Sequence, residues 1–145
     1  MTHTGPVATP IVLVVDMANV VGSIPDGWWR DRAGAAERLL SGLAALAGHT
    51  VPGPDGASIQ MARIVAVLEG SANRAGDDHS NRTEALEIFR AAGSGDDAIV
   101  DLVVDLIAAG DHLLVVSADR GLRARLPEVA TTTGPRWLNV RLGRP

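Results

Sequence analysis

Uninterrupted apolar runs alternate with segments of helical spacing along this chain. The runs at 11–15, 62–68 and 112–117 are rich in Val, Ile and Leu, which predicts strands buried on both faces. Apolar positions at helical spacing predict one helix over 31–47 and another that ends at Gly110. Because helices separate the strands, we expect right-handed crossovers and a mainly parallel sheet covered on both sides.

The segments between these elements carry weaker patterns. Residues 49–60 are rich in Pro and Gly and predict a surface loop, and the small polar residues of 71–82 predict another. Charged and apolar residues alternate over 84–91, which favours an edge strand over the alternative of a short helix. In the last quarter we expect a short helix at 121–126 and one or two short strands, around 129–131 and 137–140.

The composition indicates the class of protein. A chain of 145 residues that is 46% hydrophobic can form a single domain over 1–145, with a loose lead-in at 1–9. The absence of cysteine excludes thiol catalysis, thiolate metal sites and disulfides. No apolar run is long enough to span a membrane and the N-terminus lacks a signal-peptide pattern, so we expect a cytoplasmic protein without membrane contact.

Charge and aromatic content limit the expected partners. The net charge of −4 and the aromatic content of 3% argue against a large nucleic-acid footprint or an extended base-stacking surface. A local basic patch stays open, because arginines gather in the last quarter: Arg120, Arg123, Arg125, Arg136, Arg141 and Arg144. The pair Trp28-Trp29 is interpreted as a packing anchor at the entry of the following helix.

Carboxylates recur where predicted strands end or helices begin. Asp16 follows the first apolar run, with Asn19 three residues later, and Asp119 follows the last predicted buried strand. Asp96 and Asp97 open a helix. The ends of parallel strands and the helix starts that follow them lie at one edge of the sheet. Carboxylate and amide oxygens there suit Mg²⁺ or Mn²⁺, which can lower the pKa of a bound water and polarise a phosphodiester.

Structural roles compete with this interpretation. Asp96 can serve as a helix N-cap, Asp97 as a first-turn acid, and Asp119 as the cap of the next helix. Asp16 is harder to explain structurally, because an acid at the end of an apolar strand gains little. Glu69 also ends a predicted strand and can be a solvated loop acid. The joint occurrence of the acids at one edge favours the metal hypothesis.

Three segments, taken in order, resemble the NYN branch of the PIN-like superfamily. They are the strand–acid–x–x–Asn opening at Asp16 and Asn19, the acid pair Asp96-Asp97 before a helix, and the strand–Ser-Ala-Asp-Arg segment that contains Asp119. The resemblance implies a Rossmann-like three-layer α/β/α sandwich with a mainly parallel sheet and an acidic Mg²⁺ or Mn²⁺ pocket, acting usually on RNA. By position it implies that Asp16, Asp96, Asp97 and Asp119 are metal ligands, with Asn19 beside the first.

The leading hypothesis is a metal-dependent ribonuclease-like phosphodiesterase acting on single-stranded RNA. Asp16, Asp96 and Asp119 are its catalytic acids, Asn19 and Arg120 contact substrate, and Glu69 is a further candidate. One alternative is a phosphohydrolase of nucleotides or other small phosphate esters. Another is a non-catalytic PIN-like module that works through a protein partner. The sequence leaves a homo-oligomer open.

Overall fold

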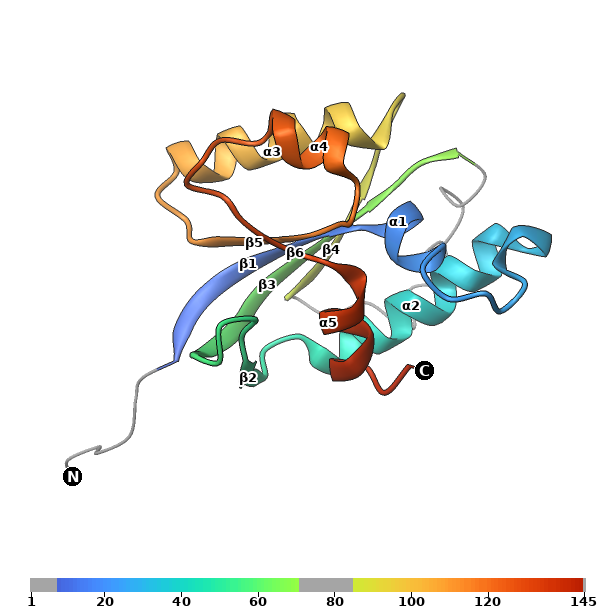
Figure 1. Ribbon diagram of the computed structural model, residues 1–145, viewed down its shortest axis with the longest axis horizontal. Helices are drawn as coiled ribbons and strands as arrows, with labels where there is room; N and C mark the ends of the chain where they lie inside the picture. The colour runs from blue at the N-terminus through green and yellow to red at the C-terminus, as the bar shows by residue number, and fades with distance from the viewer. Residues whose placement is uncertain (1–7, 71–84, 145) are drawn as a thin grey trace.

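The computed structural model describes residues 8–70 and 85–144, and within them a sheet lies between two layers of helices. Figure 1 shows α3 and α4 on one face of the sheet and α2 and α5 on the other. The elements in chain order are β1 (Thr9–Asp16), α1 (Met17–Val21), the 3₁₀ helix η1 (Trp28–Arg30), α2 (Arg32–Leu46), β2 (Thr50–Pro52), β3 (Ser58–Leu68), β4 (Leu86–Arg90), α3 (Gly95–Ala108), β5 (Leu113–Val116), α4 (Arg120–Arg125), β6 (Thr131–Thr133) and α5 (Pro135–Arg141).

The sheet runs in the order β2-β3-β1-β5-β6, and β4 also pairs with β3. All described pairings are parallel except that of β2 with β3. β1 therefore lies at the centre, with β3 and β5 on either side. The prediction of an α/β sandwich with a mainly parallel sheet is confirmed.

Side chains of β1 alternate between two cores. Ile11, Leu13 and Val15 pack with the α1, α2 and α5 layer, whereas Val12 and Val14 pack with α3 and α4. A strand that is apolar at every position is needed here because both of its faces are covered. The same burial fixes the direction and register of β1, and so fixes the place at which Asp16 leaves the sheet.

The predicted loop over 49–60 is wrong in part, since it contains β2, the turn that follows and the start of β3. The two strands pair antiparallel, with Val51 opposite Ile59. Gly53 N–H donates to the Ala57 carbonyl at 2.7 Å, and Gly56 takes a φ of 88°, a left-handed conformation that favours glycine. The Pro- and Gly-rich sequence is therefore a hairpin turn and not a long loop.

The predicted strand at 137–140 is also wrong, because these residues belong to helix α5. Pro135 occupies the first turn, where its fixed φ suits a helix. Leu138 and Asn139 are both buried while Val140 is 57% exposed, because one face of α5 packs against the protein and the other faces solvent.

Other predicted elements are close to the observed ones. The expected strand at 84–91 is β4, and the predicted helix over 31–47 is α2. Thr9, placed in the lead-in, begins β1, and the predicted loop at 71–82 lies outside the described residues. Among the described residues, no helix has the length and apolar character needed to cross a membrane.

Candidate active site

The candidate site lies where β1, β3 and β5 end at one edge of the sheet. Asp16 is the last residue of β1 and stands opposite Val67 of β3, two residues before Glu69. Val15 stands opposite Val116 of β5, so Ser117 follows at the level of Asp16. Parallel pairing thus brings together residues that are far apart in the sequence.

Asp16 is buried and held by two donors. Its side chain is the N-cap of α1 and accepts the Asn19 N–H at 3.3 Å. The Ser117 hydroxyl donates to its other oxygen at 2.8 Å, and Ser117 is itself 1% exposed. Burial raises the pKa of Asp16, these two hydrogen bonds oppose the rise, and the charges of Asp96 and Glu69 add to it.

The segment after β5 is tied to α1 and α4. The Asn19 side-chain oxygen accepts the Ala118 N–H at 2.8 Å, and Ser117 Oγ accepts the Asp119 N–H at 3.1 Å. Asp119 in turn caps α4 by accepting the Leu122 N–H at 3.1 Å. The capping role considered for Asp119 is confirmed, and it uses one of the two carboxylate oxygens.

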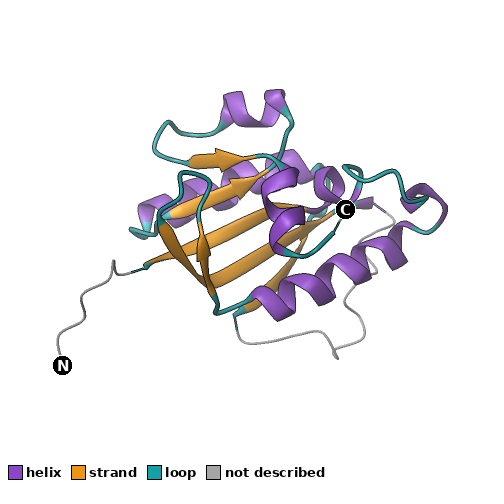
Figure 2. Ribbon diagram, turned by 60° about the horizontal axis from the view of Figure 1, so that its bottom comes forward, coloured by secondary structure: helices purple, strands orange, loops and turns teal. Residues whose placement is uncertain are grey.

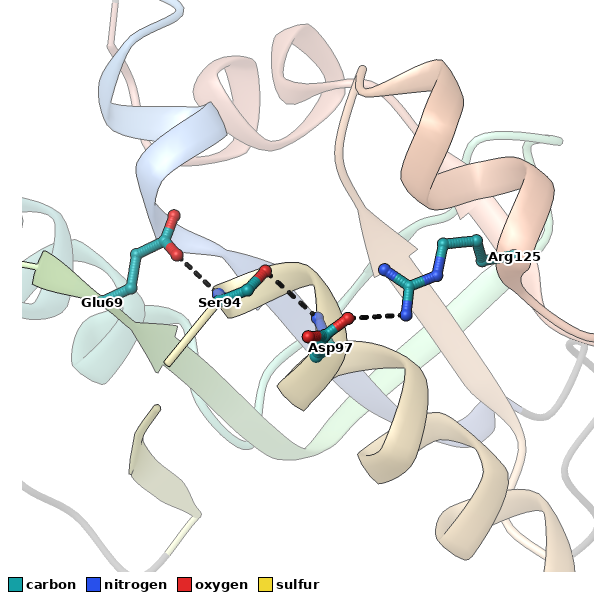
Figure 3. A network of polar contacts seen from close by, with 5 residues as sticks. Glu69, Ser94, Asp97 and Arg125 are labelled. Atoms are coloured by element: carbon teal, nitrogen blue, oxygen red, sulfur yellow. Dashed lines mark hydrogen bonds and ion pairs between the residues drawn. The ribbon is translucent and has the colours of Figure 1, made fainter. Parts of the chain in front are cut away.

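A second network, drawn in Figure 3, fixes the start of α3. Glu69 accepts a hydrogen bond from the Gly95 N–H. Ser94 is the N-cap of α3 and accepts the Asp97 N–H at 3.5 Å, so the N-cap role considered for Asp96 is wrong. Asp97 is exposed and pairs with Arg125 of α4 at 2.7 Å.

Asp96 lies in the first turn of α3 and is only partly exposed. Burial is the largest cause of its raised pKa, and the charges of Asp119, Glu69 and Asp97 raise the pKa further, while Arg125 lowers it. Asp16 and Asp96 also act on each other electrostatically. Asp96 thus interacts electrostatically with Asp16, Glu69, Asp97 and Asp119, and the assignment of these acids as metal ligands stays a prediction.

The donor chemistry of this group fits a hard divalent cation, because every acidic side chain in it offers only oxygen. In the geometry of the described residues, however, no three acidic, histidine or cysteine side chains form a cluster that could hold an ion. Asp97 is engaged with Arg125, which leaves Asp16, Asp96, Asp119 and Glu69 as the residues that would bind one. Arg120, the first residue of α4, is exposed beside Asp119.

A pocket of about 410 Å³ opens beside these acids. Glu69 lines one part, and Trp28 and Arg32 line another, with the Arg32 guanidinium 5.4 Å from the centre of the Trp28 ring. Trp28 also packs against the core, as expected of an anchor, whereas Trp29 is 53% exposed.

Ser117 is a further residue of the candidate site, and it was not among the predicted site residues. Its hydroxyl binds both Asp16 and the backbone of Asp119, so it links two of the candidate acids. The available signal was its position as the polar residue that ends a fully apolar strand.

Solved structures of another protein share the fold of this chain. The structure is similar to the crystal structures of Rae1 (YacP) from Bacillus subtilis. The W164L mutant superposes with a TM-score of 0.66 and 16% identity over 92% of this chain and 75% of that one. The structure without that mutation superposes with a TM-score of 0.65 and 15% identity, over 91% of this chain and 73% of that one. No family model and no curated protein sequence matches this chain.

These two matches show that the chain shares the α/β fold of Rae1 (YacP). At such low identity they show the fold alone. The chemistry has to be argued from the residues at the edge of the sheet.

Proposed function

We propose that this protein is a Mg²⁺- or Mn²⁺-dependent ribonuclease-like phosphodiesterase that hydrolyses single-stranded RNA at the carboxyl edge of its sheet. The observation that carries the proposal is the convergence of acids from four separate segments. Burial is the largest cause of the raised pKa of both Asp16 and Asp96, and the charges of the neighbouring acids raise it further. Mutual repulsion and burial are unfavourable for the fold, and such destabilising groups are typical of functional sites. The PIN-like fold supports the same proposal.

Asp16, Asp96, Asp119 and Glu69 are the proposed ligands of the cation. A bound Mg²⁺ or Mn²⁺ would supply charge stabilisation to the phosphate and lower the pKa of a water. The protein contributes orientation: Ser117 and the Asn19 backbone hold the Asp16 carboxylate, and the Gly95 N–H holds that of Glu69. Because these groups are ordered beforehand, less conformational entropy is lost when the cation binds.

Arg120 and Asn19 are the proposed substrate contacts. Arg120 is exposed next to Asp119 and can donate to a phosphate oxygen. Asn19 uses its side-chain oxygen on the Ala118 N–H, which leaves its amide hydrogens as donors.

The direct test is hydrolysis of a generic labelled single-stranded RNA with Mn²⁺. We expect cleavage by the wild-type chain, and a loss of at least a hundredfold in the double variant Asp16→Asn, Asp96→Asn. Asp105→Asn is the matched control, because Asp105 is exposed near the other end of α3. Equal rates for the wild type and the double variant would refute the proposal.

A second candidate is hydrolysis of a nucleotide, favoured by the pocket of about 410 Å³ that Trp28 and Glu69 line. A nucleoside would fit a partly apolar pocket of this size beside the acids. Assaying nucleoside triphosphates in parallel with RNA separates the two enzymes. Cleavage of neither, together with no stabilisation by Mn²⁺, would favour the non-catalytic module.

A further inference from the structure

A basic pocket lies on the other side of α1 from the pocket beside Glu69. It measures about 720 Å³ and lies between α1 and α5. Arg136, Asn139 and Arg144 line one wall, and Asn19, Ser23 and Ala118 line the other. No acidic side chain lines it among the described residues, although the whole chain carries a net charge of −4.

Arg144 is held in this pocket by a relay of hydrogen bonds. Its Nη1 donates to Asn139 Oδ1 at 2.9 Å, and its backbone N–H donates to the Asn139 carbonyl at 2.8 Å. Asn139 is 6% exposed, and its Nδ2 donates to Ser23 Oγ at 3.0 Å. Ser23 Oγ donates to the Val20 carbonyl of α1 at 2.6 Å. The guanidinium therefore has a fixed position relative to α1.

The side-chain hydrogen bond of Arg144 goes to a neutral group. Its Nη1 donates to the amide oxygen of Asn139, and no ion pair involves Arg144 within the part of the chain that the structure describes. Burial is the main cause that lowers the pKa of Arg144, while Asp26 raises it and Arg38 lowers it from a distance. A partly buried cation that makes no close ion pair is unfavourable, and an anionic ligand would remove much of that cost.

The far wall of the pocket joins the acidic site. Asn19 and Ala118 are linked by the 2.8 Å hydrogen bond, and the Asn19 N–H binds Asp16. A nucleic-acid strand with one phosphodiester at the acids would therefore bring a neighbouring phosphate toward this pocket. Phosphate contacts of arginine position a strand without reading its sequence.

We infer that the pocket between α1 and α5 binds a backbone phosphate of the RNA substrate, next to the one that is cleaved, through Arg144 and Arg136. The inference rests on the proposed function. The two arginines of this pocket would offset the repulsion between RNA and a chain with a net charge of −4. Asn139 acts as a positioning residue, because it sets the direction of the Arg144 guanidinium.

The test measures binding of a fluorescently labelled single-stranded RNA by anisotropy at several salt concentrations. The full chain carrying Asp16→Asn and Asp96→Asn serves as the parent, so that RNA stays intact. Adding Arg144→Ala should weaken binding severalfold at low salt. It should also reduce the slope of log affinity against log salt by about 0.7, the value for one lost phosphate contact on a single strand.

Two further variants make the result specific. Arg136→Ala removes an exposed side chain and should weaken binding in the same direction without a change in thermal stability. Arg141→Ala is the matched control: it lies on the same helix, but its guanidinium lies 5.5 Å from the Trp137 ring and donates to the Pro52 carbonyl. It should leave the salt slope unchanged.

The outcomes separate this inference from the proposed function. Cleavage by the wild type with unchanged affinity and slope in both Arg144→Ala and Arg136→Ala would overturn the inference alone. Absent cleavage with a reduced slope in these variants would overturn the proposed hydrolysis and keep the phosphate site. Failure of the parent to bind RNA at all would overturn the inference as well.

Discussion

Replacing Ser117 with alanine should destabilise the fold mainly through its effect on Asp16. Ser117 is 1% exposed, and its hydroxyl makes two hydrogen bonds, to the Asp16 carboxylate at 2.8 Å and from the Asp119 N–H at 3.1 Å. A buried hydrogen bond to a charged group contributes about 2 kcal/mol, and an unsatisfied N–H costs about 1 kcal/mol. Ser117→Ala should therefore lower the free energy of unfolding by about 3 kcal/mol, or roughly 10 °C in Tm.

The dependence on Asp16 can be isolated with a double-mutant cycle. With Asp16→Asn in place, the lost hydrogen bond joins two neutral groups and contributes about 1 kcal/mol, so the loss should shrink to about 2 kcal/mol. Urea denaturation at pH 7 of the four proteins gives the coupling energy. Ser41→Ala, which removes an exposed hydroxyl of α2, should change stability by less than about 0.5 kcal/mol. A coupling energy near zero would refute the reasoning that Ser117 serves the buried charge.

Three further predictions concern the acids and the start of α3. Asp96→Asn should abolish cleavage yet leave the Tm equal or higher at pH 7. The reason is that burial and the charges of Asp119 and Glu69 raise the pKa of Asp96, so its charged form is unfavourable in the fold. A clear fall in Tm would contradict this. The pKa values of Asp16 and Asp96 are raised from 3.8 in the folded protein, so just above pH 3.8 the folded protein binds more protons than the unfolded one. The free energy of unfolding should therefore fall as pH rises from 3.8 to the raised pKa values, and these two groups should cause no further change above them. The advantage of the double variant Asp16→Asn, Asp96→Asn in urea denaturation should therefore grow with pH, and an advantage that shrinks would be the wrong sign. Gly95→Ala should displace Glu69 and reduce cleavage, because a Cβ at Gly95 would lie 3.0 Å from the Glu69 carboxylate. Gly93→Ala is the control: a Cβ there meets nothing within 4 Å, so the rate of cleavage should not change.

The fold could be predicted best where the apolar runs were long. β1 is apolar through Val15 because both faces are covered, so its burial and its end at Asp16 could be read directly. The parallel arrangement followed from the alternation with helices, and it brought Asp16 and Asp119 to one edge. Short elements were read less well: β2 has three residues and α5 has seven, and their state depends on tertiary pairing.

The hydrogen-bonding partners in the site could not be predicted. Ser94, and not Asp96, caps α3, and the choice depends on where the chain enters from β4. The pairing of Asp97 with Arg125 joins residues 28 apart, and the hydrogen bond from Ser117 to Asp16 spans 101. Such contacts depend on side-chain positions that periodicity does not specify. These contacts decide which acids remain available to a metal ion. Asp97 forms an ion pair with Arg125, whereas Asp96 does not.

The central claim is that the carboxylates at the ends of β1, β3 and β5 and at the start of α3 bind a divalent cation. The most direct measurement is a titration of the full chain with Mn²⁺ followed by electron paramagnetic resonance, which reports free Mn²⁺. We expect saturable binding by the wild type that is lost in the double variant Asp16→Asn, Asp96→Asn and kept in Asp105→Asn. Equal binding by the wild type and the double variant, or no binding by the wild type, would contradict it.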